Sequence, residues 1–275
     1  MYAIDFEYDQ KRLSEFHMIV CSFDGSSGME TVSSGADITY AQEKPGGSDI
    51  FHLHASSYDA PYSCTFQICK SPCMRYNPGD MYLSPSQLSE IQRWLCRDSY
   101  HPFKIAQDGY TDIYWNATFT AKQINCNGRI VGLELTMYTD APYAYHDAVA
   151  YDFHFNTYDI NNQLEAEKKY FPNLSDAEGY LYPDLEIQIQ EEGTFTLTLD
   201  GRTTEIKNCR NAETITINGP RQIISSSDPA HNIAADFNFI FPRIQRDYGT
   251  EESCISANLA CGITLRYSPI MLVGL

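Results

Sequence analysis

The chain has 275 residues, of which 43% are hydrophobic and 20% are charged. Because globular domains usually comprise roughly 100 to 200 residues, this length favours two domains. No window approaches the roughly 18 uninterrupted apolar residues that a membrane-spanning helix needs, so we expect no membrane span. Residues 1–7 lack the basic segment and apolar run of a secretory signal and predict an unprocessed cytoplasmic start. For the same reason, the glycosylation sequons at Asn116 and Asn173 are interpreted as chance matches.

The formal net charge is −17, and the excess of acidic residues is even along the chain. Residues 1–148 contain 18 acidic and 10 basic residues, and residues 149–275 contain 18 and 9. Such a surface repels phosphate groups, which argues against a protein that grips nucleic acid but allows one past which DNA slides. A simpler interpretation is that the charge keeps the protein soluble.

Aromatic residues, 20 tyrosines and 14 phenylalanines, recur in short runs that alternate apolar and polar side chains. This period of two is typical of β-strands with one buried and one solvated face. The predicted strands are, in chain order, 2–8, 17–23, 50–54, 62–70, 114–122, 129–138, 185–190, 194–200, 213–218, 237–241 and 263–267. Many short strands separated by turn-rich segments predict sandwiches and not a parallel α/β sheet.

Residues 24–49 are rich in glycine and other small residues and alternate with period two only at 38–41. They predict a long loop or a protruding hairpin. Loops of this length in a compact protein are usually functional or disordered. This segment is therefore the first candidate for contact with a neighbouring subunit.

One helix is expected after residue 84. Ser84 is a suitable N-cap, Pro85 occupies the first helical position, and Gln87 completes a capping box. The apolar residues that follow at helical spacing are Leu88, Ile91 and Leu95. They share one face, which predicts that the helix packs on a sheet. Trp94 lies beside this stripe and is expected in the core, not stacked on a ligand.

A second polar interval covers residues 159–178, and within it residues 164–171 are expected to form a short helix. We place the domain boundary shortly before this interval. Residues 1–147 then form the first domain and residues 148–275 the second, with the last few residues able to return to the first domain.

The nine cysteines are an odd number and lack the paired short spacings of a zinc site. The nearest pattern, Cys64, Cys69 and Cys73, has no partnering Cys or His pair downstream. Most of the cysteines are expected to be free thiols that act as small buried hydrophobes in a reducing compartment. We expect neither a metal site nor a cofactor.

The sequence contains no phosphate-binding loop, no Gly-x-Ser-x-Gly elbow and no His-Glu-x-x-His helix. His52 and His54 would face one side of a strand, but no third ligand follows at strand spacing. Asp184 and Glu186 could hydrolyse a glycoside only if they were held across a cleft, and solvent-facing acids at a strand start are far commoner. We therefore expect a protein that is not an enzyme and has no catalytic residues.

Residues 83–95, with the sequence LSPSQLSEIQRWL, and residues 100–105 after them resemble the helix segment of siphophage distal tail proteins, which carries a Trp-Leu pair. In that family, the helix leads into strands that end in a Pro-Tyr-Ala-Tyr-like element. Residues 140–145, DAPYAY, are similar to this element. Further resemblance lies in the family's first hairpin (6–9 and 14–20), its link into the C-terminal sandwich (173–187) and its end (241–244 and 262–267). The resemblance covers nearly the whole chain in the family's order.

This resemblance implies a mainly β fold, with an N-terminal tail-tube-like domain that carries one helix and a C-terminal galectin-like β-sandwich. It implies a structural virion protein at the distal end of a phage tail, assembled in the host cytoplasm. The N-terminal domains would form a ring, normally a hexamer, that joins the tail tube protein to the tail hub or tail-associated lysin protein. The C-terminal domain would anchor receptor-binding or baseplate proteins, and DNA would cross the lumen only as transient cargo.

The main alternative is a carbohydrate-binding module of a receptor-binding protein, in which exposed aromatic side chains stack on sugar rings. It predicts a monomer with an aromatic groove on the second sandwich, whereas both tryptophans, Trp94 and Trp115, fall in the first half. A glycosidase that uses acids such as Asp184 and Glu186 is the second alternative, and no recognised catalytic motif supports it.

Overall fold

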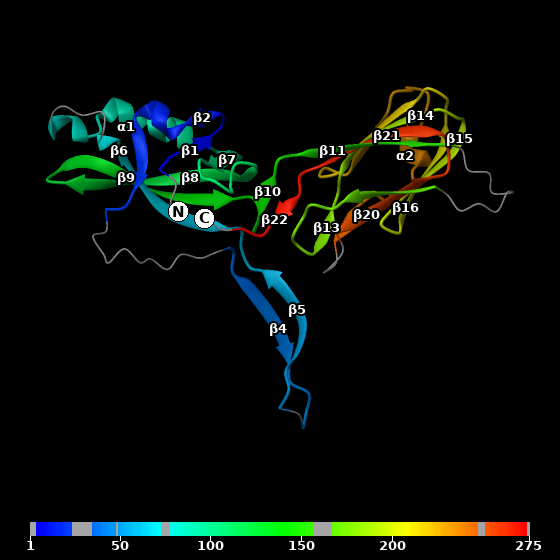
Figure 1. The fold of residues 1–275 in the computed structure, drawn as a ribbon, viewed down its shortest axis with the longest axis horizontal. Coiled ribbons are helices and arrows are strands. Elements are labelled where there is room, and N and C mark those ends of the chain that lie inside the picture. Colours follow the sequence, from blue (N-terminus) through cyan, green and yellow to red (C-terminus); the bar gives the residue numbers. More distant parts are fainter. Residues whose placement is uncertain are drawn as a thin grey trace. The chain divides into compact units, whose positions relative to one another are not determined.

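The computed structural model describes residues 4–23, 35–47, 49–72, 78–156, 167–246 and 251–273. The chain divides into two compact units, Met1–His146 with Met271–Leu275, and Asp147–Ile270 (Figure 1). Each unit has its own hydrophobic core. In the described ranges, no helix is long and apolar enough to cross a membrane.

A nine-stranded sheet organises the first unit, with seven strands in the order β2-β1-β7-β8-β9-β6-β3 and with β10 pairing β8 and β22. Its strands are β1 (Phe6–Tyr8), β2 (Lys11–Arg12), β3 (Met18–Cys21), β6 (Ser63–Lys70), β7 (His101–Ile105), β8 (Ile113–Cys126), β9 (Arg129–Thr139), β10 (Ala144–His146) and β22 (Ile270–Met271). The long β8–β9 hairpin closes through Asn127 and Gly128, which both have positive φ, 50° and 75°. Asn-Gly is the favoured pair for a two-residue hairpin turn because both positions need that conformation.

Alternating side chains of the central strands build the core of the first unit. The buried ones are Trp115, Ala117 and Phe119 on β8 and Leu133, Leu135 and Met137 on β9. These positions confirm the period-two interpretation of the sequence, since the residues between them are partly or fully exposed.

Helix α1 (Pro85–Leu95) begins as the sequence predicts. The Ser84 hydroxyl accepts the Gln87 N–H at 3.3 Å, and the Gln87 side chain accepts the Ser84 N–H at 3.2 Å, which completes the capping box. Trp94 is 4% exposed and stacks on Phe16 with ring centroids 4.4 Å apart. Its core position is confirmed. Two short 3-10 helices, η1 (Leu13–Phe16) and η3 (Pro78–Met81), complete the first unit's helical segments among the described residues.

The second unit is a sandwich of a five-stranded sheet, β11-β21-β14-β17-β18, and a four-stranded sheet, β12-β20-β15-β16. Strands β13 and β19 form a separate pair, and α2 (Ile233–Asp236) is a single turn. The strands are β11 (Val149–Phe155), β12 (Lys168–Pro172), β13 (Gly179–Leu181), β14 (Asp184–Ile189), β15 (Gly193–Leu199), β16 (Arg202–Cys209), β17 (Thr214–Asn218), β18 (Ile223–Ser226), β19 (Ile244–Arg246), β20 (Glu252–Ala257) and β21 (Cys261–Tyr267). One core cluster draws side chains from both sheets, among them Ile187 and Leu197. Face-to-face packing of this kind defines a β-sandwich.

Two predicted elements are wrong. Within the predicted helix 164–171, residues 164–166 lie outside the described ranges, and residues 168–171 belong to β12, which pairs with β20. Here Phe171 is buried and Tyr170 is 61% exposed, a strand alternation that the charged residues before it obscure.

The predicted strand 237–241 is instead an irregular segment with one isolated bridge, Ile206 to Phe237. Asn238 Oδ1 accepts the Ile240 N–H at 3.0 Å, and Phe239 has a φ of 57°. A side chain that bonds the local backbone in this way competes with a strand ladder.

Candidate functional site

The most exposed part of the first unit is the hairpin of β4 (Ile38–Glu43) and β5 (His52–Tyr58). The two strands pair only with each other, and every residue in them is exposed (Figure 1). We call residues 38–47 and 49–58 the arm. The arm confirms the hairpin alternative in part: β4 lies in the glycine-rich segment 24–49, but its partner β5 lies beyond it. Residues 24–34 and 48 of that segment lie outside the described ranges.

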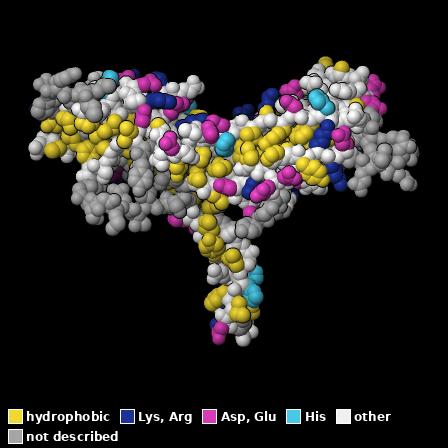
Figure 2. Space-filling view, in the orientation of Figure 1, with side chains coloured by type: hydrophobic (Ala, Val, Ile, Leu, Met, Phe, Trp, Pro, Cys, Tyr) yellow, Lys and Arg dark blue, Asp and Glu magenta, His cyan; other side chains and the backbone are white. Residues whose placement is uncertain are grey.

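Large apolar side chains of the arm lie in solvent. Their exposed fractions are 43% for Ile38, 55% for Tyr40, 67% for Ile50, 61% for Phe51, 58% for Leu53 and 39% for Tyr58. Figure 2 shows hydrophobic side chains at several levels of the arm. An isolated two-stranded hairpin is at best marginally stable in water, and contiguous exposed apolar surface marks interaction sites. The arm is therefore the candidate contact surface.

A shallow hollow of about 410 Å³ opens in the first unit where the arm begins. Its lining includes Ile38, Tyr40, Tyr58, Pro142, Leu272 and Val273. Residues near the C-terminus thus lie beside the root of the arm. The hollow has both polar and apolar walls, and it adds to the uncovered surface there.

The histidines of the arm do not form a metal centre. His54 Nε2 lies 3.2 Å from Glu43 Oε2, and both side chains are more than half exposed, 55% and 73%. His52, opposite Glu43 in the register, is also exposed. Within the described residues, no group of three His, Cys, Asp or Glu side chains could hold a metal ion.

Other residues singled out in the sequence are structural. Trp94 and Trp115 are both buried, so neither offers a stacking platform for a sugar. Asp184 Oδ1 accepts the Gly219 N–H at 3.0 Å and fixes a turn. Asn173, of the second sequon, is 4% exposed.

The cysteines differ in part from the expectation of buried hydrophobes. Eight described cysteines are free thiols, but only Cys209 and Cys261 are buried, while Cys96 and Cys126 are exposed. Burial raises the pKa of Cys209 to about 12, which keeps this thiol protonated and unreactive near neutral pH. Cys73 lies outside the described residues.

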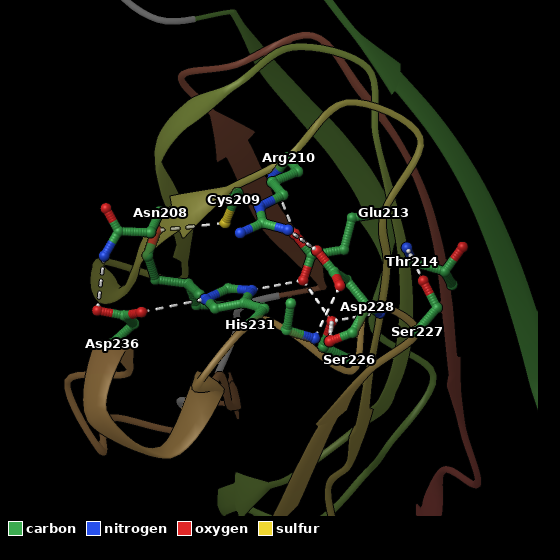
Figure 3. A network of polar contacts seen from close by, with 12 residues as sticks. Asn208, Cys209, Arg210, Glu213, Thr214, Ser226, Ser227, Asp228, His231 and Asp236 are labelled. Carbon is green, nitrogen blue, oxygen red and sulfur yellow. Dashed lines mark hydrogen bonds and ion pairs between the residues drawn. The ribbon is translucent and has the colours of Figure 1, made fainter.

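A buried polar network in the second unit has no signal in the sequence (Figure 3). His231 Nδ1 lies 2.5 Å from Glu213 Oε1, and both side chains are 1% exposed. His231 Nε2 lies 3.4 Å from Asp236 Oδ2 on α2. Ser226 on β18 donates to Glu213 at 2.5 Å, and the Arg210 N–H donates to the other carboxylate oxygen at 2.8 Å. The network therefore ties the β16–β17 turn, β18 and α2 together.

This network is not a catalytic triad. In the described structure, His231 Nε2 faces the carboxylate of Asp236, where a triad would place a serine or cysteine nucleophile. The nearby Cys209 thiol donates to the Ile206 carbonyl at 3.4 Å. The geometry of the network instead suits a structural role, in which it holds α2 against the sandwich.

We expect the second unit to lose stability in acid. Burial alone would raise the pKa of Glu213, but hydrogen bonds from Ser226, His231 and the Arg210 N–H, with the charge of His231, hold it below its usual value. A lowered pKa contributes stability above the unfolded value of about 4.3, and this is lost as pH falls through the folded value. Calorimetry between about pH 6 and pH 3 should show the second unit's unfolding temperature falling, and Glu213→Gln should flatten that dependence. An equal pH dependence in the variant would contradict this role of Glu213.

Comparisons with known proteins fit this picture. Residues 1–141 match a family model described as a phage tail protein N-terminal domain, and residues 143–267 match a phage tail C-terminal domain. No curated protein matches the chain.

The structure is similar to the crystal structure of the SPP1 Dit (gp 19.1) protein, described as a paradigm of the hub adsorption apparatus in phages that infect Gram-positive bacteria. The TM-score is 0.64 at 14% identity, over 96% of this chain and 98% of that chain. A chain of the phage P2 baseplate in its activated conformation gives a TM-score of 0.44 at 8% identity, over 95% and 97% of the two chains. The likeness to SPP1 Dit confirms the predicted mainly β fold with a galectin-like second domain. Since family models match both parts of the sequence, the chain belongs to a family of phage tail structural proteins.

Proposed function

We propose that six copies of the chain form a ring at the distal end of a phage tail tube. One ring face continues the tube protein, and the other docks the tail hub or tail-associated lysin protein. The first domain, residues 1–147, builds the ring, and the second, residues 148–275, carries host-adhesion or baseplate proteins. The protein performs no catalysis. The likeness to SPP1 Dit, from a hub adsorption apparatus, supports this assignment.

The observation that carries the proposal is the arm. Its two strands bury no residue within their own chain, yet the arm carries Tyr40, Phe51 and Leu53. Surface of this kind becomes stable when a neighbour covers it. A contact in which each copy's arm lies on the next copy is heterologous, and such contacts close into a ring when the rotation fits. Closure also prevents unlimited growth.

We expect Phe51→Ser combined with Leu53→Ser to abolish ring formation without changing the thermal stability of the monomer. Both side chains are about 60% exposed, at 61% and 58%, so their removal leaves the core untouched. Sedimentation velocity over a range of concentrations, with electron microscopy of the largest species, measures the assembly.

The matched control is Phe239→Ser, which removes a 71% exposed aromatic side chain from the second unit. It should assemble like the wild type. A wild-type chain that stays monomeric at every concentration, with tail tube protein present as a template, would refute the ring. Rings that persist in the arm variant would show that other surfaces hold them.

A further inference from the structure

The second unit contains a cavity of about 650 Å³ whose walls include His231 and Asp236. The other charged side chains in its walls are Glu192 and Arg210, and the Arg210 guanidinium is paired with Asp228 at 2.6 Å. The acids of the walls therefore face no unpaired base. Such a charge distribution favours a cation over an anion as the ligand of this cavity.

His231 and Asp236 each direct one atom toward the other. Glu213 holds His231 Nδ1 at 2.5 Å, which turns Nε2 toward Asp236 (Figure 3). Asp236 Oδ1 accepts a hydrogen bond from Asn208 Nδ2 at 2.8 Å, which leaves Oδ2 for Nε2. The His231 side chain is 1% exposed, and among the described residues its Nε2 has no hydrogen-bond partner, although Asp236 Oδ2 lies 3.4 Å away.

This separation of 3.4 Å is too long for a hydrogen bond between charged groups. An imidazolium N–H that donates to a carboxylate lies about 2.7 to 2.9 Å from the oxygen. Two ligands of one zinc ion, each about 2.0 to 2.2 Å from the metal and at a tetrahedral angle, lie about 3.4 Å from each other. The distance between His231 Nε2 and Asp236 Oδ2 therefore matches two ligands of a shared ion better than a proton held between them.

The hydrogen-bond partners of the two side chains are also those that metal ligands have. A metal-binding histidine almost always donates its other ring N–H to a carboxylate or a carbonyl, and a ligating carboxylate is itself hydrogen-bonded. Glu213 provides the first of these partners and Asn208 the second. Glu213 is fixed in turn by the Ser226 hydroxyl and the Arg210 N–H, and it is a charged acceptor for the Nδ1 proton because its pKa is held below the usual value.

We propose that His231 Nε2 and Asp236 Oδ2 bind a zinc ion, with water from the cavity in the remaining coordination positions. An imidazole nitrogen beside a carboxylate suits zinc, whereas calcium and magnesium prefer oxygen ligands. Two protein ligands are fewer than the three or four of catalytic and structural zinc sites, so the ion should exchange readily with a chelator. When bound, it would fasten the end of α2 to the network that Glu213 anchors in the sandwich.

The test is calorimetry of the full chain, first treated with a chelator and then measured with and without zinc chloride. A ligand that binds only the folded state raises the unfolding temperature. We expect saturating zinc to raise the unfolding temperature of the second unit by at least about 3 °C. Calcium chloride at the same concentration should leave it unchanged.

Asp236→Asn removes the charge of one ligand and keeps the size of the side chain, and it should abolish the rise. Asp236→Ala, at the same 20% exposed position, is a second variant that should also abolish it. The matched control is His54→Gln in the arm. His54 Nε2 and Glu43 Oε2 lie 3.2 Å apart, but both side chains are more than half exposed. The control should retain the full rise.

Cobalt(II), which substitutes for zinc and absorbs visible light, identifies the ligands. The difference spectrum between the wild type and Asp236→Asn should contain the bands of nitrogen and oxygen ligands and lack the intense near-ultraviolet band of a thiolate. A thiolate band would overturn the inference, because it would place the ion on a cysteine such as the exposed Cys96 or Cys126. An unfolding temperature that zinc leaves unchanged, or a rise that both Asp236 variants retain, would also overturn it. Since these measurements do not require the ring, they leave the proposed function to its own test.

Discussion

Replacing His231 with leucine is expected to lower the free energy of unfolding of the second unit by about 3 to 5 kcal/mol, the usual cost of leaving a buried charge without its partner. The variant leaves the Glu213 carboxylate, 1% exposed, without the His231 ring nitrogen 2.5 Å from it. Ser226 and the Arg210 N–H would remain as its donors, and neither carries a charge to the carboxylate. Calorimetry is the appropriate measurement because both tryptophans lie in the first unit and fluorescence would not report the loss.

Two further variants separate this cause from simple loss of packing. In Glu213→Gln/His231→Leu no buried charge is left unpaired, so the double variant should be more stable than His231→Leu alone. Asp236→Asn also removes a carboxylate near His231, but that side chain is 20% exposed and water compensates for part of the loss. Its effect should be much smaller. If the double variant is as unstable as the single one, the network contributes through packing and not through charge.

The sequence predicts elements whose signals are local. Ser84, Pro85 and Gln87 specify the start of α1 within four residues, and the structure reproduces their capping bonds. Strands β8 and β9, which alternate clearly, are likewise found, whereas β11, which alternates too, was not predicted. The alternation misses strand β7 because Pro102 interrupts its pattern, as proline in a strand removes a ladder donor. It misses strand β16 because Arg202–Cys209 contains mostly polar residues, although Thr204 is buried.

The functional features also divide into those that the local sequence predicts and those that it does not. The arm follows from its glycine-rich, weakly patterned sequence, which excludes a core element and leaves a loop or a hairpin. The pairing of Glu213 with His231 cannot be predicted from the local sequence. The two residues are 18 positions apart and meet only when the β16–β17 turn and α2 pack together. The row of Thr65, Thr136 and Thr120 depends on register, because three strands must align for these scattered residues to lie side by side. Local patterns contain no information about such alignments.

On helix α1, the loss of stability on truncation should follow burial along its inner face. Ile91→Ala should cost about 2 to 5 kcal/mol and Trp94→Ala about 3 to 5 kcal/mol, because each leaves a cavity among well-packed neighbours. Ile91 is 2% exposed, and Trp94 also donates a hydrogen bond from Nε1 to the Tyr8 carbonyl at 2.9 Å. Leu88, one turn earlier on the same stripe, is only partly buried, so Leu88→Ala should cost less.

Urea unfolding followed by the fluorescence of Trp115, which is fully buried, measures all three variants on one scale. Trp94→Phe separates the contribution of ring stacking to stability from that of the hydrogen bond, since phenylalanine retains the stacking on Phe16 but loses the hydrogen bond to Tyr8. That variant should lose less than Trp94→Ala. If Leu88→Ala cost as much as Ile91→Ala, the first turn of the helix would be as tightly packed as the second, and the burial gradient along α1 would be wrong. A gradient that holds would show that the end of α1 nearest Trp94 anchors the helix on the sheet, with its N-terminal turn fixed mainly by the Ser84 cap.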